Sequence, residues 1–240
     1  MNSHIAPEQA KPVDLSPMSE ACEQFASVRE VVAQQSGQRA HAVCTPMPDD
    51  AGIPYGFLEM VQTIETLREP DCGFVLQFTA AHAGAGTSMV ASGFAKAAAQ
   101  SYRRPVLYVD AAVIVDLTRP FDIVPSGSGC LFRAVAGAIS HDPTHIEEMS
   151  LSARIGLLRQ DFHAVVIDCP ALGTGAAAIT LARHCDGTAL VAAAARTGAR
   201  DMMAARESIV RVGGQVIGAV FNRARSYRPR WLGGPGHARG

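Results

Sequence analysis

The chain has 240 residues, of which 48% are hydrophobic and 18% charged, and its formal net charge at pH 7 is −1. This length suffices for one ordinary domain with a long extension, or for two small domains. The near-zero charge argues against a general nucleic-acid or anionic-membrane binder, and no apolar run reaches the ~18 residues of a membrane span. The first residues lack the basic-then-apolar order of a signal peptide, so we expect a cytoplasmic protein.

The two ends of the chain differ in composition from its middle. Residues 1–52 are rich in Pro, Gln, Ser and Ala and predict a largely disordered extension with one short helix, whose apolar face holds Phe25, Val28, Val31 and Val32. Residues 225–240 are basic and predict a flexible tail, or a docking peptide for a membrane-bound partner or an anionic surface. We therefore expect the folded domain to span residues 53–224.

Within that domain, a helical segment over 56–68 is followed by short apolar runs that alternate with further helical segments. The predicted strands are 74–78, 105–110, 164–170, 188–194 and 216–222. The helices between them are predicted over 88–101, 128–138, 150–160, 175–184 and 199–213. Strands that are apolar on both faces are typical of a parallel sheet between two helix layers. The pattern predicts a doubly wound α/β fold with a mainly parallel sheet flanked by helices, like that of P-loop NTPases.

Cysteine and histidine give no metal signal. The six cysteines are scattered without a C-x-x-C pair, which predicts reduced and mostly buried thiols. His141 and His145 have helical spacing but no evident third ligand, so a solvated helix start is favoured over a metal site.

The turn after the first predicted strand has the pattern of a phosphate-binding loop. Residues 81–88, AHAGAGTS, fit [AG]-x-x-x-x-G-x-[ST], with the last residue opening a helix. Glycines let successive backbone N–H groups point at an anion, and the helix N-terminus adds partial positive charge. We expect the nucleotide phosphates to contact this loop, with the Ser88 hydroxyl as a Mg²⁺ ligand. The expected contact residues are His82, Ala83, Gly84, Ala85, Gly86, Thr87 and Ser88.

A dinucleotide-binding fold is the rival interpretation of the same glycines. Gly84-x-Gly86 followed later by Asp110 resembles its opening. The third glycine position is Met89, however, which is too large for the close strand–helix packing of that fold. The rival is therefore disfavoured.

Two aspartates follow predicted strands and are the candidate catalytic residues. Asp168 ends the apolar run Val165–Ile167, the Walker B arrangement, in which the carboxylate holds Mg²⁺ directly or through water. A helix-capping role at the strand end remains the alternative for Asp168. Asp110 ends the strand that follows the loop helix.

The ordered set FVLQFTAAHAGAGTS, PVLYVDAA, FHAVVIDCPAL, DGTALVAAAA and VIGAVFNRA resembles the bacterial tyrosine kinase (BY-kinase, CpsD/CapB-type) family over about residues 56–223. That family belongs to the deviant Walker P-loop group with the MinD and ParA ATPases. The resemblance implies ATP or ADP with Mg²⁺, Asp110 in the second Walker A-like motif, Asp168 as Walker B and Asn222 as a base contact. It also implies capsule or exopolysaccharide biosynthesis, with a membrane polysaccharide co-polymerase (chain-length determinant) as partner. The protein would lie peripherally at the inner membrane through this partner, with a possible homo-oligomer and no nucleic acid.

Several charged residues of the family pattern are missing. Thr87 stands at the lysine position of the loop, and His82 stands at the signature lysine of MinD and ParA. The D-x-D-x-R motif lacks its second carboxylate and its arginine after Asp110. The oligomerisation pattern E-x-x-R-x-x-R has its nearest match at Glu59, where Gln62 and Glu65 stand in place of the two arginines. The tail carries one tyrosine, Tyr227, in place of a cluster.

Phosphoryl transfer depends on stabilising charge at the phosphate oxygens, and removal of one such donor lowers rates by about 10²–10³. We therefore expect a degenerate, pseudokinase-like accessory protein with weak or absent nucleotide binding. An active ATP-dependent tyrosine autokinase or ATPase, a MinD/ParA-like positioning switch and a scaffold with a collapsed site remain alternatives. Arg103, Arg104 and Arg196 are the candidate replacement cations.

Overall fold

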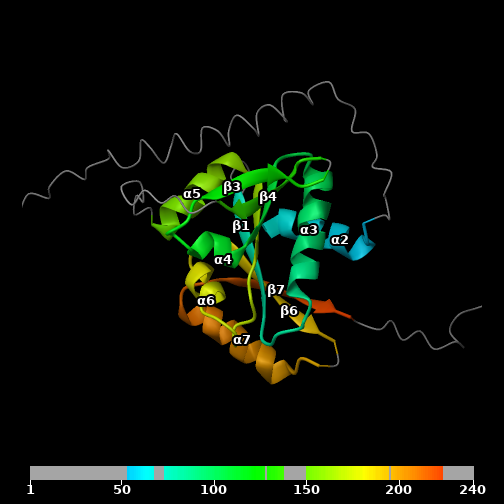
Figure 1. Ribbon diagram of the computed structural model, residues 1–240. Helices are drawn as coiled ribbons and strands as arrows, with labels where there is room; N and C mark the ends of the chain where they lie inside the picture. Colours follow the sequence, from blue (N-terminus) through cyan, green and yellow to red (C-terminus); the bar gives the residue numbers. More distant parts are fainter. Residues whose placement is uncertain (1–52, 68–72, 128, 138–149, 195, 224–240) are drawn as a thin grey trace, which may run out of the picture.

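The computed structural model describes residues 53–67, 73–127, 129–137, 150–194 and 196–223, which fold around one seven-stranded sheet (Figure 1). The strand order is β3-β4-β2-β5-β1-β6-β7. The strands are β1 (Phe74–Ala80), β2 (Val106–Asp110), β3 (Phe121–Pro125), β4 (Leu131–Ala136), β5 (Ala164–Asp168), β6 (Gly187–Ala193) and β7 (Val216–Asn222). All neighbours pair in parallel except β3 and β4. The five predicted strands and the mainly parallel sheet are confirmed.

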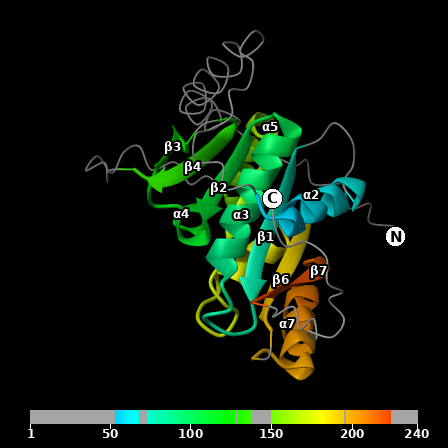
Figure 2. The same cartoon turned by 90° about the vertical axis from the view of Figure 1, so that its right-hand side faces the viewer.

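Helices cover both faces of this sheet, as predicted (Figures 1 and 2). They are α2 (Tyr55–Leu67), α3 (Thr87–Tyr102), α4 (Ala111–Val115), α5 (Leu151–Asp161), α6 (Ala177–Ala182) and α7 (Ala199–Arg211). The α2 and α3 helices enclose one hydrophobic core with the sheet, and α4, α5 and α6 enclose the other. The fold class is therefore the predicted doubly wound α/β fold with a mainly parallel sheet.

The central strands are apolar on both faces because each face lies beneath a helix layer. Every residue of β1, β5 and β6 is buried. Gln77 in β1 is one of the few buried polar residues in these strands, and its amide donates to the Thr188 hydroxyl at 2.8 Å and to the Ala178 carbonyl oxygen at 3.2 Å. This buried amide is fully used, and it ties α6 to the middle of the sheet.

The helix predicted over 128–138 is wrong, because residues 131–136 form β4 and pair with β2 and β3. No sequence pattern predicted β3 or the five-residue α4. Gly127 and Gly129, in the segment between β3 and β4, have φ values of 76° and 98°, which favour glycine, and β4 pairs antiparallel with β3. An apolar run of this length fits a short helix or a buried strand equally well, and pairing with β2 decides between them.

Several predictions fall on residues outside the described ranges. They concern the amphipathic helix with Phe25, the pair His141 and His145, Tyr227 and the basic tail. Within the described part of the chain, no helix has the length and apolar character that a bilayer crossing needs.

Candidate functional site

The carboxyl ends of the parallel strands gather the predicted site residues at one edge of the sheet. β1 leads into the phosphate loop, β2 ends at Asp110, β5 ends at Asp168 and β7 ends at Asn222. In the register, Asp168 pairs with Phe78 of β1 on one side and with Asp110 of β2 on the other. The topology therefore brings together residues that lie far apart in the sequence, at the position where open α/β sheets bind ligands.

The phosphate loop has the backbone geometry that an anion requires. Gly84 and Gly86 have φ values of 79° and 87°, in the left-handed region that favours glycine. The α3 helix begins at Thr87, one residue earlier than predicted, and its N-cap residue Gly86 provides no side-chain cap. The backbone N–H groups of the first turn therefore face the loop without a competing side chain, and the helix dipole points the same way.

Asn222 supports this loop from β7. Its buried amide Nδ2 donates to the carbonyl oxygen of Ala85 at 2.8 Å. A Cβ atom on Gly86 would lie only 2.1 Å from the same nitrogen. Two constraints therefore favour glycine at position 86. Its backbone is left-handed, and a side chain there would collide with Asn222. The amide predicted to contact a base holds the loop in this structure.

His82 joins the loop to α7. Its Nε2 lies 3.2 Å from Oδ2 of Asp201, and both side chains are largely exposed. The same carboxylate accepts from the backbone N–H of Gly198 at 3.2 Å, at the start of α7. The hydrogen bond from His82, followed by that from Gly198, lowers the pKa of Asp201. Asp201 was not among the predicted site residues, although an acid three residues after a helix N-cap is a recognisable signal.

Asp168 is almost fully buried, with 7% of its surface exposed, and one of its oxygens is already engaged. The hydroxyl of Tyr108 in β2 donates to Oδ2 of Asp168 at 2.9 Å. Burial, and then the negative charge of Asp168, raises the pKa of Tyr108 far above its usual value. The phenol therefore stays neutral and acts as a donor at neutral pH. No sequence pattern pointed to this contact.

Asp110 has a structural task at the end of β2. Its Oδ1 accepts from the backbone N–H of Ala112 at 2.7 Å, which makes it the N-cap of α4. The α4 helix is in turn fixed by Arg154 of α5, which is 5% exposed. The guanidinium of Arg154 donates to the carbonyl oxygens of Val113, Ile114, Asp116 and Arg119 at 3.0–3.4 Å. No sequence pattern predicted this role of Arg154.

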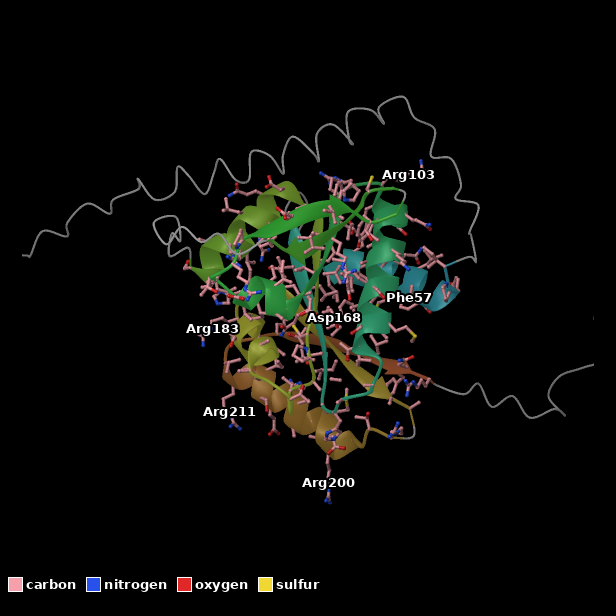
Figure 3. The ribbon with its side chains drawn as sticks, viewed as in Figure 1. Phe57, Arg103, Asp168, Arg183, Arg200 and Arg211 are labelled. Carbon is pink, nitrogen blue, oxygen red and sulfur yellow. The ribbon has the colours of Figure 1, made fainter. Side chains whose placement is uncertain are left out.

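Two of the three candidate replacement cations lie away from the loop. Arg103 is the C-cap of α3, and Arg104 follows it, whereas the phosphate loop precedes the same helix (Figure 3). A 16-residue helix is about 24 Å long, so neither side chain reaches the loop. Arg196 follows β6 at the same edge of the sheet as the loop and is exposed.

The geometry offers an anion cradle and a limited set of metal ligands. Backbone N–H groups of the loop and α3 suit phosphate oxygens. The Ser88 hydroxyl is exposed, and Asp168 has one oxygen that Tyr108 does not contact. Among the described residues, no cluster of three or more His, Cys, Asp or Glu side chains could hold a metal ion. A metal there would depend on phosphate oxygens and water for its remaining ligands.

No protein-family model matches the chain. It is similar to the tyrosine-protein kinase CpsD of Streptococcus pneumoniae serotype 4, with 29% identity over 94 residues, which are 39% of this chain and 41% of CpsD. The match thus spans well under half of that relative.

Two solved structures share the fold. The chimerical protein CapA2B2 matches with a TM-score of 0.59 and 19% identity, over 82% of this chain and 99% of the other. The kinase domain of the Escherichia coli tyrosine kinase ETK matches with a TM-score of 0.52 and 20% identity, over 71% and 78%. The chain is therefore similar to the tyrosine-protein kinase CpsD over part of its length, and it shares the fold of the ETK kinase domain.

Proposed function

We propose that this protein is a degenerate BY-kinase-like accessory factor of capsule or exopolysaccharide biosynthesis and export, with weak or no nucleotide binding. The observation that carries the proposal is the contrast at one edge of the sheet. The backbone of the phosphate loop keeps its anion-binding form, while Thr87 stands where the family has its lysine. The two nearby acids accept hydrogen bonds from neighbouring groups. Asp168 accepts from the hydroxyl of Tyr108, and Asp110 accepts from the backbone N–H of Ala112 at the start of α4.

The missing lysine has a defined energetic effect. A charged hydrogen bond contributes about 1.5–3 kcal/mol, so its loss weakens phosphate binding by roughly 10- to 150-fold. Thr87 can donate one neutral hydrogen bond but supplies no charge. Backbone N–H groups and the helix dipole still attract an anion, which is consistent with a site that binds nucleotide weakly.

ATP or ADP with Mg²⁺ is the ligand that these residues fit best. Residues 82–88 would contact the phosphates, and Ser88 with the second oxygen of Asp168 would contact the metal. When bound, Mg²⁺ neutralises charge on the phosphate oxygens. The Tyr108 hydroxyl competes for Asp168, which further weakens the metal site.

Isothermal titration with MgATP and MgADP tests the site. We expect millimolar or undetectable affinity for the natural chain and at least about tenfold tighter binding for Thr87→Lys, because it restores the charge. Thr180→Lys, on an exposed threonine of α6, is the matched control and leaves the affinity unchanged. Micromolar affinity of the natural chain contradicts the degenerate site.

An active tyrosine autokinase or ATPase is the second candidate. It is favoured by the position of Asp110 and Asp168 at the ends of adjacent strands beside the loop. Phosphate release and an anti-phosphotyrosine signal that disappear in Asp168→Ala would establish it. A MinD/ParA-like switch instead requires dimerisation that depends on ATP, which size-exclusion chromatography with and without ATP detects.

The proposed partner is a membrane polysaccharide co-polymerase, which would bring a cytoplasmic protein to the inner membrane. Glycosyltransferase genes and a gene for a two-span co-polymerase beside this one would support the process. Co-sedimentation with membranes that contain that co-polymerase, and not with membranes that lack it, tests the partner directly.

A further inference from the structure

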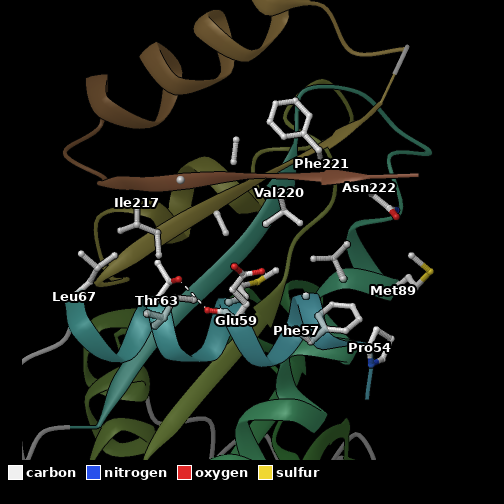
Figure 4. A pocket seen from close by; sticks show the side chains of 17 residues that line it. Pro54, Phe57, Glu59, Thr63, Leu67, Met89, Ile217, Val220, Phe221 and Asn222 are labelled. Carbon is white, nitrogen blue, oxygen red and sulfur yellow. Dashed lines mark hydrogen bonds between the residues drawn. The ribbon is translucent and has the colours of Figure 1, made fainter. Parts of the chain in front are cut away.

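A mainly apolar groove with a volume of about 480 Å³ runs between α2 and the edge strand β7 (Figure 4). The α2 wall includes Phe57 and Leu67, and the β7 wall presents Ile217 and Val220 toward it. Asn222 lies at the end of the groove near Pro54 and Met89, beside the phosphate loop. The groove therefore follows the outer edge of the sheet and ends at the candidate site.

The walls of this groove are fixed by packing. The ring of Phe57 lies against α3, where a Cβ atom on Gly93 would be only 2.4 Å from it. Val61 and Ile64 of α2 are buried in the core. On the other wall, a Cβ atom on Gly218 would meet no atom within 4 Å. The space between α2 and β7 is thus open while its two sides are held in place.

Large apolar side chains around this groove face water. Leu67 and Met89 line it and are 60% and 56% exposed, whereas the 68% exposed ring of Phe221 lies on the side of β7 away from α2 (Figure 4). β7 is also an edge strand, with one row of backbone groups unpaired in the sheet. Exposed apolar patches and sheet edges are features that proteins usually cover with another segment or a partner.

The chain beyond β7 starts at this groove. Asn222 lines it, and Arg223 follows with a φ of 58°, a left-handed conformation that changes the direction of the chain as the strand ends. Trp231 is nine residues beyond Asn222 (231 − 222), so it can reach about 30 Å from the strand end. The 13-residue α2 is only about 20 Å long, so Trp231 can reach any point of the groove.

The charges of the two partners are complementary. α2 contains Glu59 and Glu65 and no lysine or arginine, and Glu59 lines the groove. Residues 224–240 contain four arginines and no acid, and their apolar pair Trp231–Leu232 follows Arg228 and Arg230 directly. A tryptophan buries a large apolar area while its indole N–H can still donate to a polar rim.

We propose that the C-terminal segment of the same chain docks in the groove between α2 and β7. Trp231 and Leu232 insert between the two walls, and the arginines that precede them lie toward the acidic α2. The docked segment covers the edge strand and the exposed apolar side chains of Leu67 and Met89. Because the groove ends at Asn222, docking also shields the support of the phosphate loop from solvent.

Trp231 is the single tryptophan of the chain, so its fluorescence reports on this contact in the full-length protein. We expect a blue-shifted emission and an acrylamide quenching constant several-fold smaller than that of a synthetic peptide of residues 224–240. Gly218→Phe fills the groove and should return both values to those of the peptide. Gly156→Phe in α5, where a Cβ atom also meets nothing within 4 Å, is the matched control and should keep the protection.

Thr63→Arg, at an exposed groove position of α2, is a second way to repel the tail if Gly218→Phe does not fold. The proposal is overturned if Trp231 is as exposed in the native chain as in the peptide, as it would be if the N-terminal segment filled the groove. The proposal is also overturned if Trp231 stays protected from acrylamide in both groove variants. The same holds if the control Gly156→Phe removes that protection. Protection that rises with protein concentration would assign the tail to a second copy and exclude docking within one chain.

Discussion

The phosphate loop and the pair of aspartates lie at the same edge of the sheet, yet they are built in different ways. The loop consists of backbone geometry, with left-handed Gly84 and Gly86 and an uncapped helix start. The aspartates depend on side chains, and both are engaged by neighbours, Asp168 by Tyr108 and Asp110 by the start of α4. A backbone cradle persists when charged side chains are lost, because core packing and Asn222 hold it. An aspartate that accepts hydrogen bonds from neighbouring groups has fewer oxygen lone pairs left for a metal ion or a substrate.

The largest expected effect comes from Arg154, which holds the helix that Asp110 caps. Arg154→Ala removes a buried guanidinium and leaves several carbonyl oxygens in the α4 region without a donor, which should lower the free energy of unfolding by about 3 kcal/mol. Urea unfolding followed by circular dichroism measures it. Arg159 of the same helix lies nearer the surface and pairs with Asp186, so Arg159→Ala should cost about 1 kcal/mol or less. Equal losses would show that the carbonyl contacts of Arg154 contribute little.

Two glycine substitutions test how the left-handed backbone and Asn222 hold the phosphate loop. Gly86→Ala places a Cβ atom against Asn222 and strains a left-handed backbone, so we expect a loss of about 2–3 kcal/mol in unfolding free energy. Gly84→Ala strains the backbone alone, since its Cβ atom would meet nothing within 4 Å, and should cost about 1 kcal/mol. The difference between the two isolates the Asn222 contact. If the two variants unfold at the same urea concentration, Asn222 does not support the loop as the structure indicates.

Tyr108→Phe tests whether the Tyr108 hydroxyl competes with a metal ion for Asp168. Loss of the hydroxyl removes the donor to Asp168 and should cost about 1 kcal/mol of stability. It also frees a carboxylate oxygen, so the affinity for MgADP should rise while the affinity for ADP without Mg²⁺ stays unchanged. Calorimetry with and without Mg²⁺ makes this comparison, and Tyr55→Phe, on an exposed tyrosine of α2, is the control. A lower MgADP affinity in Tyr108→Phe would indicate that the tyrosine assists the site instead of competing with the metal.

The smallest effect concerns the exposed link between His82 and Asp201. The pKa of Asp201 is lowered in the folded protein, so its contribution is fully present above the pKa of the unfolded carboxyl group. It is lost as the pH falls through the lowered value. Melting temperatures measured from neutral pH into the acid range should therefore decline slightly less steeply for Asp201→Asn than for the natural chain. Identical slopes would mean that this pair is not formed in solution.

Sequence patterns predicted most of the fold because the signal was long and repeated. Buried strands such as β1 and β5 are apolar runs, and the glycine turn before α3 fixes where strand becomes helix. The region from 111 to 136 was missed, since α4 has only five residues and β4 is too short for periodicity to separate strand from helix. Its structure depends on pairing with β2 and on Arg154, which are contacts between distant parts of the chain.

The sequence by itself determined the α/β class and the glycine turn of residues 81–88 between β1 and α3, with Thr87 in place of a lysine, because these are local properties of short segments. Only the tertiary structure decided that Tyr108 donates to Asp168, that Asn222 donates to the carbonyl oxygen of Ala85 and that a groove remains open beside β7. Each of these features depends on strand order and register. Tyr108 and Asp168 are 60 positions apart in the sequence, and Ala85 and Asn222 are 137 positions apart, yet the sheet brings each pair into contact. A pattern within one segment carries no information about such neighbours.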